Sequence, residues 1–258
     1  IKKSLNVIKT SRKLQNLNES TIHFNLENPS FDDKVLEDIN VVYFFASLSN
    51  INFCENNKKF SNLINYTNTK KTIKLLLKKK IKIFFISTSK VFDINSKSPN
   101  EGTNKRPQNY YAYLKLKIEN QFKNNNLFIV LRLGKVLNKD FINEILDNNL
   151  FKKDSYKVNK DLYISPIHID NLCYVMLKLN YIKNFYGNLN FCSTDSISYY
   201  ELYQFIKNRY SLKKNILIKK NIYKTENTFK ELMNTKKIKK IGIRVFSSKT
   251  HINKLIYK

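Results

Sequence analysis

Short, almost continuously apolar runs alternate along the chain with longer segments of helical character. The apolar runs at Asp38–Ala46, Ile81–Thr88 and Leu127–Leu133 predict strands that are covered on both faces of a sheet. Apolar residues at helical spacing, with lysines between them, predict a helix at Asn56–Lys80, and a second helix is predicted at Asn109–Lys123. Strands that alternate with helices of this length are joined by βαβ crossovers. We therefore expect an α/β fold with a parallel sheet.

The pattern loosens after Gly134, where we expect a second, smaller lobe. The core would cover residues 1–134 and the lobe residues 135–258, partly interleaved with the core. Shorter elements are predicted as strands at Leu5–Thr10, Thr21–Leu26 and Asn188–Cys192, helices at Phe141–Leu150 and Ile169–Leu179, and a polar loop at Lys152–Asp161. Ser198, with Glu201 three residues later, resembles a capping box that opens one more helix.

Composition excludes several classes of protein. At 258 residues, 42% of them hydrophobic, the chain can bury a sizeable core. Its apolar runs are far shorter than the roughly 20 residues that a membrane-spanning helix needs, and no signal peptide is recognisable. The three cysteines and three histidines are scattered, which indicates neither a disulfide framework nor a zinc site. We expect a cytoplasmic protein with no membrane partner and no metal.

The formal net charge of +27 suggests a nucleic-acid partner, but composition offers another explanation. Glycine, alanine and proline are scarce, whereas Asn, Ile and Lys, whose codons can be written with A and T alone, abound. Only five of the 47 basic residues are arginine, whose planar fork best binds phosphates and bases. We therefore favour a compositional origin of the charge over a specific nucleic-acid partner.

A Tyr-x-x-x-Lys pair on a helix places both side chains on one face, one turn apart. The ammonium is expected to lower the pKa of the phenol from about 10, which makes the tyrosine a general acid or base. This spacing occurs seven times in the chain, so context has to select the pair. Tyr111 and Lys115 follow a predicted strand that ends in Ser87 and Thr88. The carboxyl ends of strands are where open α/β sheets bind ligands.

The order of these motifs resembles the extended short-chain dehydrogenases/reductases of the NAD-dependent epimerase/dehydratase superfamily. That family has a strand ending in S-T-x-x-V-F/Y-x-G, then E…P-x-x-x-Y-G-x-S/T-K-x-x-x-E, then a strand ending in L-R. The corresponding stretches here are Ser87–Asp93, Glu101–Glu119 and Val130–Arg132. Tyr163–Pro166 and Ile197–Glu201 look like the sugar lobe of the dTDP-4-dehydrorhamnose reductases.

This resemblance implies a doubly wound parallel sheet of the Rossmann type, incomplete at its N-terminal start, with a smaller sugar-binding lobe. It also implies NAD(P)H-dependent reduction of a 4-keto nucleotide sugar. Tyr111 would donate the proton, Lys115 would lower its pKa and hold the cofactor ribose, and Thr88 would hydrogen-bond the reacting oxygen. The implied cofactor-binding residues are Arg12, Ala46, Ser47 and Lys115, and the implied substrate-binding residues are Ser87, Thr88, Lys135 and Pro166. Arg12, just after a predicted strand, is placed to meet a ribose 2′-phosphate, which favours NADP over NAD. A homodimer is left open.

The chain also departs from the family pattern. Its four glycines lack the G-x-x-G-x-x-G spacing of the turn that brings backbone amides to a pyrophosphate. Because the chain begins with Ile1, we interpret it as a fragment that starts after that turn. We expect weak dinucleotide binding, low stability, and an unpaired edge on the strands at Leu5–Thr10 and Asp38–Ala46. A nucleotide-sugar 4-epimerase or dehydratase is the alternative enzyme, and an inactive sugar-nucleotide or nucleic-acid binding protein is the alternative from another class.

Overall fold

A four-stranded parallel sheet lies at the centre of the molecule. The computed structural model describes residues 6–145, 155–183, 185–210, 215–219 and 229–256. The sheet has the order β10-β5-β4-β3. Its strands are β3 (Val41–Phe44), β4 (Lys82–Thr88), β5 (Phe128–Leu133) and β10 (Gly187–Phe191). The three strands expected from the longest apolar runs are therefore confirmed, and so is their parallel arrangement.

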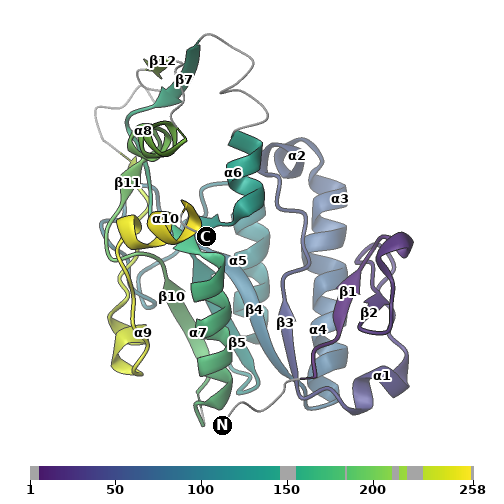
Figure 1. Ribbon diagram of the computed structural model, residues 1–258. Helices are drawn as coiled ribbons and strands as arrows, with labels where there is room; N and C mark the ends of the chain where they lie inside the picture. The colour runs from purple at the N-terminus through teal and green to yellow at the C-terminus, as the bar shows by residue number, and fades with distance from the viewer. Residues whose placement is uncertain (1–5, 146–154, 184, 211–214, 220–228, 257–258) are drawn as a thin grey trace.

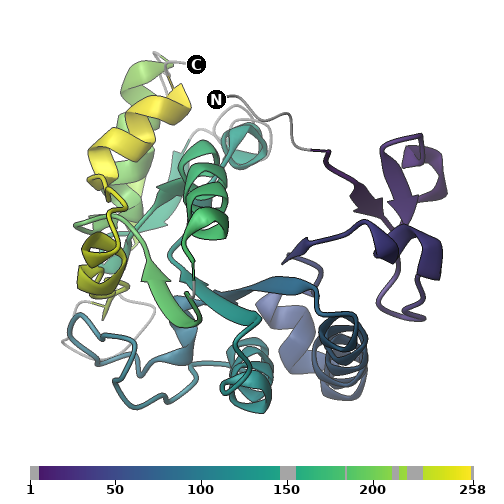
Figure 2. The ribbon, with the colours of Figure 1, turned by 90° about the horizontal axis from the view of Figure 1, so that it is seen from below.

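Helices cover both faces of this sheet (Figures 1 and 2). One face carries α3 (Lys58–Asn62), a π-helical segment (Leu63–Asn68), α4 (Thr69–Lys78) and α5 (Tyr110–Phe122). Ile73 of α4 and Ile118 of α5 share a core with Phe85 of the sheet. The other face is covered by α7 (Ile169–Tyr181), whose Leu172 packs in a second core with Phe84. Helices on both faces of a parallel sheet are the doubly wound arrangement that the sequence predicts.

The first strands form a unit of their own. β1 (Lys9–Ser11) pairs in parallel with β2 (Thr21–His23), and in the described residues neither strand pairs with the main sheet. Figure 2 shows this unit, in purple, to one side of β3. It also holds the short helices η1 (Leu14–Asn16) and α1 (Asp33–Glu37). As expected, β1 and β3 each have one edge without a strand partner in the described part of the chain.

Short elements follow Gly134 along the chain. They are β6 (Val136–Leu137), α6 (Lys139–Ile145), β7 (Ser155–Asn159), β8 (Leu162–Ile164), β9 (Ile167–His168), β11 (Ile197–Ser198), α8 (Tyr199–Arg209), β12 (Asn215–Lys219), β13 (Phe229–Lys230), α9 (Lys236–Lys240) and α10 (Ser248–Ile256). Leu137, Leu202 and Ile252 share a third core, in addition to the two cores on the faces of the main sheet. β10 and α7 also follow Gly134, yet they belong to the layers of the main sheet.

Of the predictions for the residues after Gly134, the polar loop is wrong and the capping box is confirmed. The polar stretch Lys152–Asp161 contains β7, which pairs in parallel with β12 and is therefore more than a loop. The capping box is present: Ser198 Oγ accepts from the Glu201 backbone N–H, and the Glu201 carboxylate accepts from the Ser198 N–H. The helix predicted at Phe141–Leu150 corresponds to α6, and its residues 146–150 lie outside the described residues.

Candidate active site

The candidate site begins at the carboxyl end of β4, where Thr88 leaves the sheet. Thr88 Oγ1 accepts a hydrogen bond from the backbone N–H of Lys90 (3.2 Å) and so caps the single-turn helix η3 (Ser89–Val91). The side chain is half-buried. This bond uses a lone pair of the hydroxyl oxygen, and the O–H group is still able to donate to a ligand. The capping role and a ligand-binding role of Thr88 are therefore compatible.

At the start of helix α5, two polar side chains accept hydrogen bonds from its first backbone N–H groups. Asn109 Oδ1 accepts from the Ala112 N–H (2.9 Å), which makes Asn109 the N-cap. Glu55, from α2 (Ile51–Asn56), accepts from the Tyr110 N–H (2.5 Å). These bonds satisfy donors that have no partner inside a helix. They fix the start of α5, and with it the direction in which each later side chain points.

The inner face of α5 carries Tyr111, Lys115 and Glu119, which follow one another at intervals of about one turn. Lys115 and Glu119 are each 2% exposed, and Tyr111 is partly buried. Tyr113 lies outside this face and is 45% exposed. The structure therefore places Tyr111 and Lys115 together on the inner side of the helix and leaves Tyr113 toward solvent.

Burial dominates the protonation of the tyrosine and lysine. Lys115 Nζ lies 4.6 Å from the ring centroid of Phe85 and 5.7 Å from that of Tyr111. Desolvation lowers the pKa of Lys115 to about 7, although the Glu119 carboxylate acts in the opposite direction. Desolvation raises the pKa of Tyr111 to about 12, although a hydrogen bond with the Ser47 side chain acts to lower it. The Tyr111 pKa is therefore raised and not lowered as expected, because the cost of burying a phenolate outweighs the effect of the hydrogen bond with Ser47.

Ala46 and Ser47 follow β3 and reach the same corner of the sheet. Ser47 forms the hydrogen bond with Tyr111, and Ala46 packs against the core beneath. The next residue along this loop, Leu48, is held at its backbone N–H and its carbonyl by the buried side chain of Asn65 in the π-helical segment. Leu48 N–H donates to Asn65 Oδ1 (2.8 Å), and Asn65 Nδ2 donates to the Leu48 carbonyl (2.9 Å). The structure thus brings Ser47 to Tyr111 on a loop that is fixed from behind.

Ser87, predicted as a second substrate contact, faces the interior of the molecule. It is 3% exposed, and its Oγ donates to Glu119 Oε1 (2.5 Å). Glu119 also accepts from Arg132 of β5, at 2.6 Å from Nη2 and 3.1 Å from Nε. The Ser87 hydroxyl is therefore committed to a buried ion pair. Thr88 is the hydroxyl that the end of β4 offers to a ligand.

The turn after β5 brings Lys135 and Pro166 next to each other. The Ile167 N–H donates to the Lys135 carbonyl (2.8 Å), and Pro166 is buried. Lys135 Nζ lies 5.1 Å from the ring centroid of Phe141. At Gly134 a Cβ atom would lie only 2.2 Å from the carbonyl oxygen of the residue before Pro166, so this close approach requires glycine. The two predicted substrate residues therefore lie next to each other just beyond the end of β5.

Arg12 stands apart from these residues. It follows β1 and is exposed, and it forms no hydrogen bond or ion pair with any other residue that the structure describes. The structure thus brings together Ala46, Ser47, Tyr111 and Lys115 but leaves Arg12 on the separate β1–β2 unit.

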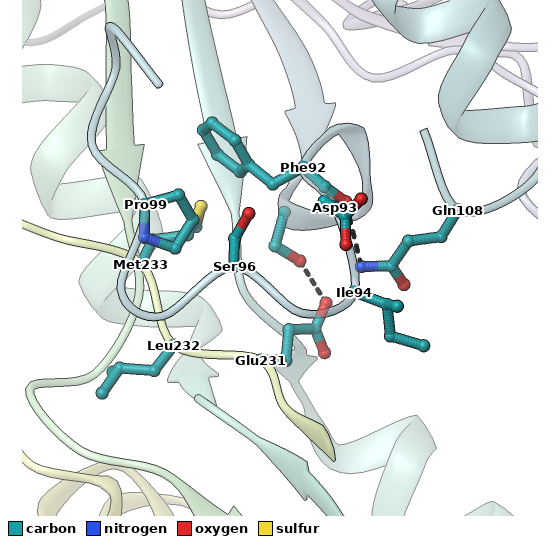
Figure 3. Close-up of a pocket in the computed structure, with 10 residues that line it drawn as sticks. Phe92, Asp93, Ile94, Ser96, Pro99, Gln108, Glu231, Leu232 and Met233 are labelled. Atoms are coloured by element: carbon teal, nitrogen blue, oxygen red, sulfur yellow. Dashed lines mark hydrogen bonds between the residues drawn. The ribbon is translucent and has the colours of Figure 1, made fainter. Parts of the chain in front are cut away.

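A small pocket beside η3 contains a residue that sequence reasoning missed (Figure 3). It lies between the loop after η3 and the segment that starts at Glu231. Glu231 accepts a hydrogen bond from Ser89 Oγ and forms an ion pair with Lys90 at 3.8 Å. Glu231 lies 142 positions from Ser89 in the sequence. No local pattern links residues at such a separation, so only the fold reveals this contact.

The arrangement contains groups that can donate and accept protons. A phenol, an ammonium and a hydroxyl lie at the carboxyl ends of adjacent strands and on the helix that follows them. No cluster of three or more potential metal-ligating side chains occurs among the residues that the structure describes. Within the same part of the chain, no helix has both the length and the apolar character to cross a membrane.

Several solved structures share this fold at low sequence identity, although no curated protein matches the chain. The dTDP-4-dehydrorhamnose reductase of Bacillus anthracis, in complex with NADP, is 18% identical and has a TM-score of 0.81 over 97% of this chain and 98% of that chain. The reductase of Clostridium acetobutylicum is 19% identical, with a TM-score of 0.77 over 95% and 92%. The UDP-glucose 4-epimerase of Thermotoga maritima is 16% identical, with a TM-score of 0.75 over 95% and 85%.

The sequence itself identifies the family. The model of the RmlD substrate binding domain matches residues 2–256, which is nearly the whole chain. The strand that ends in Thr88, the helix that carries Tyr111 and Lys115, and the lobe after Gly134 all lie within the matched region. This chain therefore belongs to the RmlD substrate binding domain family.

Proposed function

We propose that this chain is a nucleotide-sugar oxidoreductase that uses NAD(P)H to reduce a 4-keto nucleotide sugar, with Tyr111 as the proton donor. The observation that carries the proposal is the Tyr111 phenol, which hydrogen-bonds with Ser47 and lies one helical turn from the buried Lys115. Membership of the RmlD family supports it, and so does the fold shared with proteins named as dTDP-4-dehydrorhamnose reductases.

Each residue has one task in this reaction. Thr88 donates a hydrogen bond to the carbonyl oxygen of the sugar and polarises it. When bound, the reduced nicotinamide supplies the hydride that adds to the carbonyl carbon. Tyr111 then gives its proton to the oxygen, and its raised pKa ensures that the phenol carries this proton at neutral pH. Lys115, with a pKa of about 7, is suited to return a proton to Tyr111 afterwards.

The residues around Tyr111 fit the nicotinamide end of a dinucleotide. Ala46 and Ser47 line that corner, and Lys115 offers an ammonium to the ribose hydroxyls. We propose NADP or NAD as the cofactor. Arg12 on the β1–β2 unit favours NADP, because an arginine is suited to bind a 2′-phosphate. The Bacillus anthracis reductase structure contains NADP.

We also propose a substrate lobe and a cellular location for this chain. Residues 135–258 supply the nucleotide-sugar lobe, with Lys135 and Pro166 on the substrate side. A cytoplasmic location is included because Cys54, Cys173 and Cys192 are all free thiols.

A stoichiometry measurement tests the proposed reaction. The purified chain is incubated with NADPH or NADH and a 4-keto nucleotide sugar, and both reduced cofactor and sugar product are quantified. The proposal predicts one reduced cofactor consumed for each sugar reduced. The alternative is a nucleotide-sugar 4-epimerase, which the shared fold with the Thermotoga maritima epimerase favours. An epimerase would instead interconvert the 4-hydroxyl sugars without net cofactor consumption, and no turnover of either kind would reject both enzyme functions.

A binding measurement separates these enzymes from a nucleic-acid module. Contacts between lysines and phosphates release counterions, so this type of binding weakens steeply with salt. We expect only loose, sequence-independent binding that is lost at physiological ionic strength. Submicromolar affinity for a defined DNA or RNA at that salt concentration would favour the binding module.

A further inference from the structure

Glu119 joins three elements beneath the candidate site. It lies on α5, accepts a hydrogen bond from Ser87 at the end of β4 and pairs with Arg132 on β5. All three side chains are at most 3% exposed. Burying two charges costs several kcal/mol for each ion and is often no more stabilising than apolar packing at the same place. Stability alone therefore does not account for an ion pair at this depth.

The position of this pair relative to Lys115 provides a reason. Glu119 and Lys115 lie one turn apart on the inner face of α5, and the next turn carries Tyr111. The titratable groups that face Lys115 are Tyr111 and Glu119 on α5 and Cys54 on α2. From β4 it meets the ring of Phe85. Glu119 is the carboxylate in this set, and its charge opposes the desolvation of the ammonium.

We propose that Glu119 is a positioning residue, whose carboxylate stabilises the ammonium of Lys115 while its bonds to Ser87 and Arg132 hold the end of β4 against α5. It acts on the reaction through Lys115 and through the placement of Thr88, and it does not contact the substrate. Arg132 orients the carboxylate, because its fork binds both oxygens of Glu119, at 3.3 Å and 2.6 Å. This inference rests on the proposed reduction.

The pH profile of turnover tests this role. Without the carboxylate the ammonium is less stable, so Lys115 loses its proton at lower pH. In Glu119→Gln we expect the alkaline limb of kcat to move down by about one pH unit. Glu119→Asp keeps the charge and should restore most of the limb. Glu201→Gln removes a carboxylate from the capping box of α8, and this matched control should lower stability without moving the limb.

A second measurement keeps the test independent of turnover. The protein is labelled with ¹³C at the ζ carbon of tyrosine, and the Tyr111 resonance is assigned by its loss in Tyr111→Phe. This resonance reports the titration of Lys115 Nζ, which lies 5.7 Å from the ring centroid. The titration should move to lower pH in Glu119→Gln. Absence of turnover in the unaltered protein would reject the proposed function, whereas this titration still decides the role of Glu119.

Loss of one partner leaves Arg132 buried and unpaired, so Glu119→Gln is also combined with Arg132→Met. The double variant removes both buried charges and should still titrate at lower pH than the unaltered protein, by a smaller amount. If the folded variants kept both the kcat limb and the titration within about 0.3 pH unit of the unaltered protein, the inference would be overturned.

Discussion

The inner face of α5 and the β1–β2 unit both carry residues expected to bind the cofactor, but they are held in different ways. Lys115 is 2% exposed and lies beside Phe85, which belongs to a core shared by strands β4 and β5. Arg12 is exposed on a unit of two three-residue strands, where Val7 is 58% and Leu14 71% exposed. In the described residues that unit has no strand pairing with the main sheet.

This difference suggests that the residues of α5 determine the rate of the proposed reaction, whereas those of the β1–β2 unit affect only the affinity for the cofactor. The groups that we propose for proton transfer are held by the protein itself, because Ser47, Asn65 and Glu119 form hydrogen bonds with their neighbours. Such preorganisation favours the chemical step. In the proposed complex the far end of a dinucleotide would meet the exposed Arg12, and exposed ionic contacts contribute little. We therefore expect changes on α5 to act on turnover and changes on the β1–β2 unit to act weakly on cofactor binding.

The largest effect should follow Tyr111→Phe. Loss of the proton donor should lower kcat by about 10²-fold or more, within the range for a positioned general acid. Tyr113→Phe is the matched control, because this phenol is 45% exposed and lies outside the inner face. Its kcat should change less than about twofold. Steady-state kinetics of both variants check the register of α5, and a larger loss in Tyr113→Phe would show that the site has been assigned to the wrong face.

The next effect concerns stability and its dependence on pH. The folded pKa of Lys115 is about 7, below the ordinary value of 10.5 in the unfolded chain. Below pH 7 both states hold the proton and the cost of burial is complete, and this cost disappears as pH rises from 7 to 10.5. Lys115→Met should therefore raise the free energy of unfolding by on the order of 3 kcal/mol at pH 6.5 and by much less at pH 9.5. Urea titrations at the two pH values measure this, and an equal gain at both would contradict the lowered pKa.

The smallest effect is expected on the β1–β2 unit. Arg12→Gln should weaken NADPH binding about three- to fivefold and leave NADH binding unchanged, because only NADPH carries a 2′-phosphate. Lys13→Gln changes a neighbouring exposed cation and serves as the control. Calorimetric titrations give both affinities. Equal weakening of NADH and NADPH would remove Arg12 from the phosphate site.

The sequence predicts the strands and the helix around the candidate site well and the elements farther from it poorly. The central strands and α5 have clear hydrophobic patterns in the sequence. Because the strands are buried on both faces of the sheet, their continuous apolar runs favour a strand over other secondary structures. β7 escaped prediction because a polar stretch becomes a strand only through its pairing with β12. The direction of the Tyr111 pKa was wrong for a related reason. Spacing reveals that Lys115 is near, but only packing reveals how strongly both groups are desolvated.

In the proposed reaction, hydride from the reduced nicotinamide is added to carbon 4 of a 4-keto nucleotide sugar. Reduced cofactor with deuterium in the transferred position of the nicotinamide provides the most direct test. The chain is incubated with this cofactor and a 4-keto nucleotide sugar, and the product is analysed by NMR and mass spectrometry. The account predicts one deuterium at carbon 4, and no labelled product with Tyr111→Phe within the time of one turnover of the unaltered chain. Product without deuterium, or a sugar recovered unreduced under all conditions, would contradict it.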